Sequence, residues 1–434
     1  MRASCLVFGV LLAGCSSSDF SVAADAGPTD TGSSTDTGVV ADSGGTDSGV
    51  AETSTDGAAD APPCVEGPAN PAIVYVDKRA TRPGKGTLDC PFQTIKDAVA
   101  LVATLPTGSG AHTLRVAGGT GAAPLVYDEP VLILKNGWTL LGDGAGRVTI
   151  TGGGKCGDSQ CLVVMEGGSA LEGVRLDALG KVMTPLGLTP GAFTSVVIKS
   201  TVVTGVKSEK VPAVYVEGTG NAEFGPDVRV IENAGIGIAV KNVFRLKFSA
   251  TAGLPNQINK NGFGIALGGG VIDLGGPTEV SSNVGHGVLV QSPDKGTHNF
   301  DGLAAKNNGL SGLYLEVGAS ARVRRSTFLR NKVGITFKSA PGSELDLGKL
   351  LDPGNNVLGG KTDSNATAAI CSPVARTLDM PAWNDAFKAC APSTAPIDAT
   401  KSCDELGSYQ DIWFAVATGS SKAPFDVQNC TVGP

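Results

Sequence analysis

The middle of the chain repeats one pattern of polar and apolar positions: an asparagine, one or two glycines, and then a short apolar segment. The pattern starts at Asn233, Asn261, Asn283, Asn308 and Asn331. The last glycines before the apolar segments are 27, 23, 25 and 22 residues apart, and they are Gly237, Gly264, Gly287, Gly312 and Gly334. A period in the low twenties with a strand in each repeat predicts a solenoid, in which stacked repeats bury a continuous core.

The repeats have no room for intervening helices, and further short apolar segments at 243–248 and 321–328 lie between them. Three short strands per repeat predict a parallel β-helix, which the handedness rule for parallel crossovers makes right-handed. Alternation within a strand places Ile265 and Leu267 in the core and Ala266 outside. We expect the five glycines to stack along one corner, where a β-carbon would be crowded. Asparagine tolerates left-handed backbone and can bond to its own turn. Identical asparagines in successive turns can also form a hydrogen-bonded ladder.

The solenoid begins differently. Residues 73–77 form an apolar strand, and the segment from Cys90 to Ala98 predicts a helix with Pro91 in its first turn. Phe92, Ile95, Val99 and Val102 have the spacing of one buried helical face. Solenoids need caps, so this helix is expected to close the open end of the core.

The order of Tyr75-Val76-Asp77, Pro91-Phe92-x-Thr94-Ile95 and Gly142-Asp143-Gly144 resembles the start of the pectin-lyase-like β-helix superfamily. In particular it is similar to the DUF1565 type of module, whose function is unknown. The specific resemblance covers residues 73–145, and the looser repeat pattern extends it to about residue 360. It implies an all-β fold, a right-handed parallel β-helix with an N-terminal helical cap.

The N-terminus has the layout of a secretory signal: Arg2, an apolar run from Cys5 to Leu12, and then small residues. Its ending, Leu12-Ala13-Gly14-Cys15, resembles a bacterial lipobox. The resemblance implies removal of residues 1–14, a diacylglyceryl thioether on Cys15 and an acylated new amino terminus, and more than one acyl chain makes attachment stable. Ser16 is not the aspartate that retains such proteins at the inner membrane. We therefore expect an exported protein, anchored to the outer membrane of a Gram-negative bacterium; the alternative is an ordinary cleaved signal.

Residues 15–63 are built from Ser, Thr, Asp, Gly and Ala after the cysteine, and they are expected to be a disordered tether. The tether carries nine of the 41 acidic residues and none of the 34 basic ones. Residues 64–434 are left with 33 basic and 32 acidic residues. The folded part is therefore nearly neutral, which argues against a nucleic-acid partner.

Eight cysteines remain once Cys5 and Cys15 are set aside, an even number typical of disulfides in an exported protein. They are Cys64, Cys90, Cys156, Cys161, Cys371, Cys390, Cys403 and Cys430. Proximity suggests the pairs Cys64–Cys90 and Cys156–Cys161, with two bridges among the last four. A metal site is the alternative, but the chain has three histidines and no Cys-x-x-Cys, so we assign no metal and no cofactor.

Residues 64–360 are thus expected to form the β-helix, and residues 361–434 a disulfide-rich C-terminal cap. Two of the three tryptophans, Trp383 and Trp413, lie in this last segment. They belong to the core of the cap in our interpretation. The alternative is a small binding domain in which they stack on sugars.

Known catalytic patterns of similar β-helix enzymes are missing. Pectate lyases use clustered aspartates for calcium and an arginine as base, but Arg322, Arg324 and Arg325 have no evident acidic set facing them. The catalytic aspartate phrases of pectin methylesterases are absent. Asp273 and Asp346 each stand ten residues before an asparagine, which suggests turn residues bonded to backbone or, alternatively, a calcium loop.

Gly285-His286-Gly287 matches a phrase of polygalacturonases. Those enzymes also need carboxylates one repeat earlier, where this chain has Asn259-Lys260-Asn261. His286 aligns with Ile236 and Phe263 of sister repeats, so it occupies a variable position and its replacement by Phe should leave no buried polar group unpaired. We assign no catalytic residue and keep His286 as a candidate for glycan contact.

The sequence therefore predicts a membrane-anchored β-helix lipoprotein, at the surface or in the periplasm. It is expected to act as a scaffold or to bind a polysaccharide or a surface protein. The alternative is a polysaccharide lyase or glycoside hydrolase whose active site has no recognised motif.

Overall fold

The computed structural model describes residues 64–65, 67, 71–82, 84–106, 110–291, 296–338, 344–348, 354–358, 365, 368–372, 378–379, 410–414 and 427–428. Contacts between residues divide the chain into two units, Met1–Pro63 and Cys64–Pro434. The predicted signal, Cys15 and the predicted tether all lie outside the described residues. Within the described ranges, the helical segment is too short to cross a membrane.

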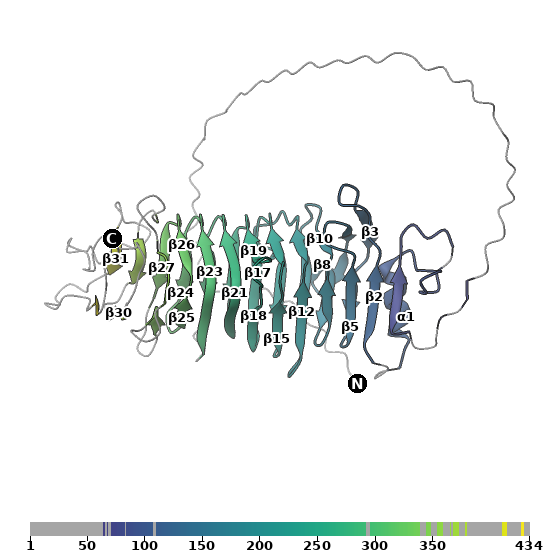
Figure 1. Cartoon of the computed structure of the whole chain (residues 1–434), viewed down its shortest axis with the longest axis horizontal. Coiled ribbons are helices and arrows are strands. Elements are labelled where there is room, and N and C mark those ends of the chain that lie inside the picture. The colour runs from purple at the N-terminus through teal and green to yellow at the C-terminus, as the bar shows by residue number, and fades with distance from the viewer. Residues whose placement is uncertain are drawn as a thin grey trace, which may run out of the picture. The chain divides into compact units, whose positions relative to one another are not determined.

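The described residues of the unit Cys64–Pro434 form a right-handed parallel β-helix with three faces (Figure 1). Face 1 contains β1 (Ile73–Val76), β2 (His112–Val116), β5 (Trp138–Gly142), β9 (Ala170–Glu172), β12 (Ser195–Lys199), β15 (Asn221–Phe224), β18 (Arg245–Phe248), β25 (Ser320–Arg324) and β28 (Leu345–Asp346). Face 2 contains β3 (Leu125–Glu129), β6 (Val148–Gly152), β10 (Arg175–Asp177), β13 (Val202–Thr204), β16 (Arg229–Ile231), β19 (Asn256–Asn259) and β26 (Thr327–Leu329). The long strands β21 (Val271–Ser281) and β23 (Thr297–Lys306) belong to both faces and join them into one sheet.

Face 3 is a separate sheet. It contains β4 (Leu132–Leu134), β7 (Gly154–Cys156), β8 (Ser159–Glu166), β11 (Thr184–Thr189), β14 (Val214–Glu217), β17 (Ile236–Asn242), β20 (Phe263–Leu267), β22 (Val288–Val290), β24 (Ser311–Leu315), β27 (Val333–Phe337), β29 (Ala368–Ser372) and β31 (Gln410–Phe414). All of its described pairings are parallel except that of β7 with β8. A small separate pair joins β30 (Leu378–Asp379) to β32 (Val427–Gln428).

Inward positions stack in columns along the core. Ile265 and Leu267 are fully buried and Ala266 is partly exposed, which confirms the predicted alternation. On face 1, Phe224 pairs in register with Phe248, and their rings stack with centroids 4.9 Å apart. Burying an apolar side chain of this size contributes about 1.5–3 kcal/mol, so each column adds stability in proportion to its length.

The predicted asparagine ladder is present and longer than expected. The Nδ2 of each asparagine donates to the Oδ1 of the next over 2.9–3.2 Å, from Asn233 through Asn331 to a sixth member, Asn365. Each Oδ1 also accepts the backbone N–H of the preceding asparagine, and the second Nδ2 proton goes to a strand carbonyl. The buried amides therefore satisfy one another and the corner backbone.

The corner glycines stack as predicted. A β-carbon on Gly237, Gly264, Gly287 or Gly312 would lie 2.2–2.9 Å from the carbonyl oxygen of the next glycine in the column, so close approach of the chains requires glycine here. Asparagine tolerates left-handed backbone, but in this corner the left-handed residue is the one before the ladder asparagine. Lys260 and Ser282, for example, both have φ of 55°. The asparagine is held instead by its two ladder bonds.

The helix α1 (Ile95–Ala103) starts later than predicted. Phe92 is still extended, because its N–H donates to the Tyr75 carbonyl and its own carbonyl accepts from Asp77, as a strand residue would. Thr94 is the N-cap, and its Oγ1 accepts the Asp97 N–H over 3.1 Å. Pro91 is therefore outside the helix, and the fully buried face consists of Ile95, Ala98 and Val102, with Val99 partly buried.

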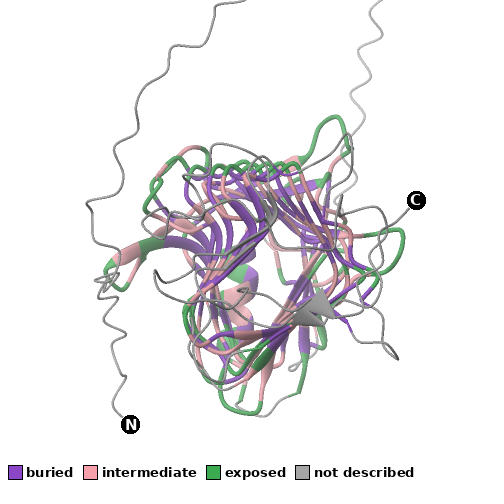
Figure 2. Cartoon of the chain, turned by 90° about the vertical axis from the view of Figure 1, so that its left-hand side faces the viewer, coloured by how far each residue is buried: buried purple, intermediate pink, exposed green. Residues whose placement is uncertain are grey.

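A buried carboxylate fixes this helix at the start of the solenoid. Glu129, at the end of β3, accepts the N–H groups of Ile95 over 2.6 Å and of Lys96 over 3.1 Å. Seen along the solenoid from its C-terminal end, the helix lies across the core behind the ring of strands (Figure 2). The predicted N-terminal cap is thus present.

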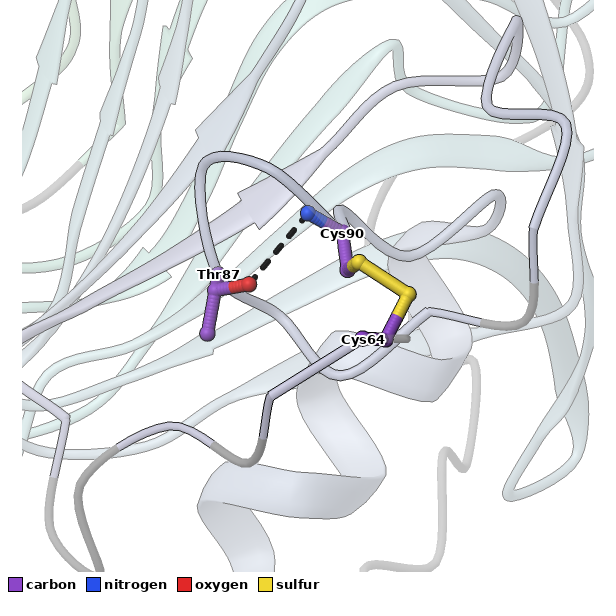
Figure 3. The surroundings of a disulfide bond; sticks show 3 residues. All are labelled: Cys64, Thr87 and Cys90. Carbon is purple, nitrogen blue, oxygen red and sulfur yellow. Dashed lines mark hydrogen bonds between the residues drawn. A yellow bond between two sulfur atoms is a disulfide. The ribbon is translucent and has the colours of Figure 1, made fainter. Parts of the chain in front are cut away.

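Two disulfides join the pairs that proximity suggested. Cys64 is bonded to Cys90 with their Cα atoms 5.8 Å apart, and the Cys90 N–H donates to Thr87 Oγ1 (Figure 3). Cys156 is bonded to Cys161, across the antiparallel pair of β7 and β8. Disulfides of this kind are typical of exported proteins.

The solenoid continues beyond residue 360, where the sequence suggested that it ends. β29 pairs in parallel with β27, and β31 pairs in parallel with β29. Asn365 also extends the asparagine ladder into this segment. The residues between these strands are more numerous than in earlier repeats, which hides the period without interrupting the stack. The cysteines Cys390, Cys403 and Cys430 and Trp383 lie outside the described residues, as do the side chains of Cys371 and Trp413.

Candidate functional site

The outer surface of face 3 carries a row of mainly apolar side chains that the strand register places side by side. We call this row the outer strip; its members are Ile133, Val164, Gly187, Tyr215, Ala239, Ala266, Leu289, Tyr314 and Thr336. All but Thr336 are at least partly exposed. The two tyrosines of the strip differ from its other members because each has an apolar ring with a hydroxyl group at its tip, and both parts can contact a ligand.

His286 lies at the edge of this strip, beside Tyr314. It occupies the same corner position as Phe263, because the Gly264 N–H donates to the His286 carbonyl, which confirms the alignment of the repeats. The His286 ring centroid is 4.6 Å from that of Tyr314 and 5.9 Å from that of Phe263. Three rings from successive turns of the solenoid therefore form one partly exposed cluster.

The protonation state of His286 follows from its surroundings. Burial, together with the positive charge of Lys338, lowers the pKa of His286 to about 4, so the imidazole is neutral at physiological pH. The Ser311 N–H donates to His286 Nδ1 over 3.1 Å, which places the remaining proton on Nε2. Among the described residues Nε2 has no hydrogen-bond partner, so the N–H is available to a ligand.

This bond corrects an expectation from the sequence. Ser311 is 1% exposed, and its backbone N–H depends on the imidazole as acceptor. A phenylalanine at position 286 would leave that N–H unpaired, although Phe263 occupies the equivalent position elsewhere. The residue type at this corner position varies between repeats. In this turn, however, the side chain of His286 accepts a hydrogen bond from the buried Ser311 N–H.

Charged groups complete the cluster on the side of Tyr314. Lys338 Nζ lies 5.2 Å from the centroid of the Tyr314 ring and 3.5 Å from Glu316 Oε1. Burial raises the pKa of Tyr314, so its hydroxyl is protonated at neutral pH. The cluster thus offers an N–H, an O–H, an ammonium and a carboxylate around exposed ring surface.

The arginines and aspartates of faces 1 and 2 are arranged differently. Arg324 is nearly buried and donates to Asp346 Oδ2 over 2.8 Å, and Arg325 pairs with Asp301. The aspartates that pair with these arginines therefore come from neighbouring turns of the solenoid. The sequence analysis did not identify these pairs. Asp346 also accepts the Gly348 N–H, as a turn aspartate would, whereas Asp273 lies within β21 and accepts from Asn299 Nδ2. In the described ranges, no three metal-ligating side chains converge.

Sequence reasoning found His286 and aligned it with Phe263 of the preceding repeat, but it missed Tyr314, Glu316 and Lys338. Tyr314 lies in β24, Glu316 directly follows β24 and Lys338 directly follows β27, between 28 and 52 residues beyond His286. Tyr314 stands two residues after a corner glycine, as the outward Ala266 does, so the repeat alignment contained the signal.

No family model matches the chain, and a search of curated proteins also finds no match. Among solved structures, the A-module of the Azotobacter vinelandii mannuronan C-5 epimerase AlgE6 is similar at 13% identity and a TM-score of 0.42, over 74% of this chain and 94% of that one. The Dettilon tailspike protein is similar at 13% identity and 0.39, over 79% and 68%. Pectin methylesterase PemA from Erwinia chrysanthemi is similar at 14% identity and 0.28, over 72% and 80%. Likeness at this level assigns no activity to this chain.

Proposed function

We propose that this protein is exported, attached to the outer membrane through a lipid on Cys15, and binds a polysaccharide on the outer surface of face 3. Export is supported by the two disulfides, and the anchor by Leu12-Ala13-Gly14-Cys15. The proposal includes membership of the pectin-lyase-like superfamily and a DUF1565-type start over residues 73–145, both supported by the sequence resemblance.

The observation that carries the binding function is the geometry around His286. The bond from the Ser311 N–H to Nδ1 leaves the imidazole proton on Nε2, which has no hydrogen-bond partner among the described residues. The rings of Phe263 and Tyr314 lie beside it. Sugars combine apolar faces with hydroxyl groups, so ring surface next to donors and acceptors suits them. The carboxylates needed for glycosidic cleavage are not gathered around this imidazole within the described chain.

The binding function is tested with a glycan array of purified neutral and acidic polysaccharides, probed with the wild type and two matched variants. Lys338→Ala removes the ammonium group beside Tyr314, which pairs with Glu316 on face 3. Lys247→Ala is the control, because it removes a lysine that pairs with Glu223 on face 1. We expect Lys338→Ala to weaken binding about tenfold and Lys247→Ala to leave it unchanged. Equal effects of the two variants, or no binding by the wild type, would contradict the proposal.

Assays for reducing ends and unsaturated products on the same polysaccharides decide between binding and cleavage. Turnover by the wild type would show an enzyme instead. The anchor is tested separately with Cys15→Ser, which should abolish acyl labelling and partition into the aqueous phase of a detergent extract. Unchanged labelling in that variant would refute the anchor and leave the binding site untouched.

A further inference from the structure

A set of one tyrosine, one glutamate and one lysine occurs twice on the outer surface of face 3. Tyr215 and Tyr314 occupy the same column of face 3, and each is followed two residues later by a glutamate, Glu217 or Glu316. The column runs from Tyr215 through Ala239, Ala266 and Leu289 to Tyr314, so the two tyrosines are four turns apart. At about 4.8 Å per turn, the spacing is about 19 Å.

Each glutamate forms an ion pair with a lysine from the next turn. Lys241 follows Val240, which pairs with Val216, and its Nζ lies 2.8 Å from Glu217 Oε1. Lys338 follows Phe337, which pairs with Leu315, and its Nζ lies 3.5 Å from Glu316 Oε1. The two Tyr–Glu–Lys sets therefore have the same composition and the same Glu–Lys ion pair. They differ in that a register shift after Val216 places Asn242 opposite Glu217.

The hydroxyl of Tyr215 is bonded to the glutamate of its own set. Tyr215 donates its hydroxyl to Glu217 Oε2 over 3.0 Å, and burial followed by this bond raises the pKa of Tyr215. The positions between the two tyrosines carry Ala239, Ala266 and Leu289, which are all apolar. The two tyrosine positions thus each present a ring beside a Glu–Lys pair, and the three positions between them present apolar side chains.

We propose that face 3 binds one extended, unbranched polysaccharide chain along the solenoid axis, with a sugar on each tyrosine and its hydroxyl groups on the two Glu–Lys pairs. The inference rests on the proposed function and specifies its ligand. Both clusters belong to one rigid sheet, so once the first is occupied, binding at the second is intramolecular. A chain that reaches about 19 Å engages both, and a shorter one engages a single cluster.

The experiment uses the full chain and the polysaccharide that binds best on the array, cut into fragments of increasing length. Calorimetry measures the dissociation constant of each fragment for the wild type, Tyr215→Ala, Tyr314→Ala and the double variant. We expect the wild-type affinity to rise at least tenfold once a fragment spans about 19 Å. Either single substitution should remove this rise, and the double variant should bind no fragment.

Thermal unfolding of each variant confirms that it is folded, and Tyr215→Phe, which keeps the ring, should retain most of the rise. Affinity that is independent of length, or a Tyr215→Ala variant that behaves as wild type while Tyr314→Ala does not, would overturn the extended-chain model and leave single-site glycan binding intact. Self-association through face 3, detected by sedimentation and lost in Tyr215→Ala, would also overturn it. Absence of any wild-type binding would remove both proposals.

Discussion

Asn283 and His286 lie three residues apart in one corner of the solenoid, and the two side chains face opposite environments. Asn283 points inward, where both of its Nδ2 protons and its Oδ1 have partners from neighbouring turns. His286 points outward, where Nδ1 accepts from Ser311 and the Nε2–H has no partner in the described chain. Inside the corner every polar group is used to hold turns together, whereas outside it one is left for a ligand.

The comparison teaches how a solenoid separates stability from recognition. Interior positions must repeat, because each turn supplies the partners of the next. Exterior positions have no such constraint. The corner position that carries Ile236 and Phe263 in two turns can therefore carry His286 in the next. The following predictions test this separation, from the largest expected effect to the smallest.

Gly287→Ala should destabilise the protein most, by more than about 4 kcal/mol. The new β-carbon would lie 2.7 Å from the Gly312 carbonyl oxygen and 2.9 Å from Asn308 Nδ2, so the ladder or the strand must shift. Denaturant unfolding followed by circular dichroism measures the loss. Gly146→Ala is the matched control, since its β-carbon would meet no atom within 4 Å. Equal stability of the two variants would contradict the close-packed corner.

Asn308→Ala should cost about 3 kcal/mol. One Nδ2 proton and the backbone N–H of Asn283 would lose their acceptor in the interior, and the Val280 carbonyl would lose the Asn308 donor. The control is Asn299→Ala, which removes one bond to Asp273 on the outer surface of face 1 and should cost less than about 1 kcal/mol. The two free energies of unfolding are compared under identical conditions. If Asn308→Ala lowers the free energy of unfolding no more than Asn299→Ala does, the ladder does not stabilise the fold.

Acidification should destabilise the wild type through His286. Its folded-state pKa of about 4 is below the unfolded value of 6.5, so the unfolded chain binds the proton first. Stability contributed by the neutral imidazole is complete above about pH 6.5 and declines as the pH falls towards 4, by at most about 3 kcal/mol. Unfolding of wild type and His286→Phe across this range isolates the contribution. Parallel pH profiles for the two proteins would show that His286 is not held neutral.

At neutral pH, His286→Phe should fold but lose about 1–2 kcal/mol of stability, because the buried Ser311 N–H loses its acceptor. Its polysaccharide affinity should fall as well, through loss of the Nε2–H. The reciprocal variant Ile236→His, at the equivalent corner of an earlier turn, should change neither property much. A His286→Phe variant with wild-type stability would restore the simpler view that this corner is merely variable.

Much of the fold was predictable because it is periodic. The asparagine and glycine columns follow from their spacing alone, and the inward positions of Ile265 and Leu267 follow from alternation. The two described disulfides were predictable from short separations, 26 and 5 residues. The start of α1 was not, since Phe92 is held extended by Tyr75 and the helix is capped by Glu129, 34 residues after Ile95. The sequence did not predict that the parallel stack continues past residue 360. The connections between β27, β29 and β31 are longer than those of earlier repeats, so the period cannot be recognised there.

The sequence by itself determined the solenoid. A parallel stack makes the same contact in every turn, so the same residue types recur at a regular spacing along the sequence. The sequence also marked His286 as an exception within that pattern. Tertiary structure alone decided what the exception means. The acceptor role of Nδ1, the neutral imidazole and the rings and charges beside it depend on Ser311, Tyr314 and Lys338, which are 25, 28 and 52 residues away. Pairing across turns sets such contacts, and the register that creates them exists only once the chain is coiled.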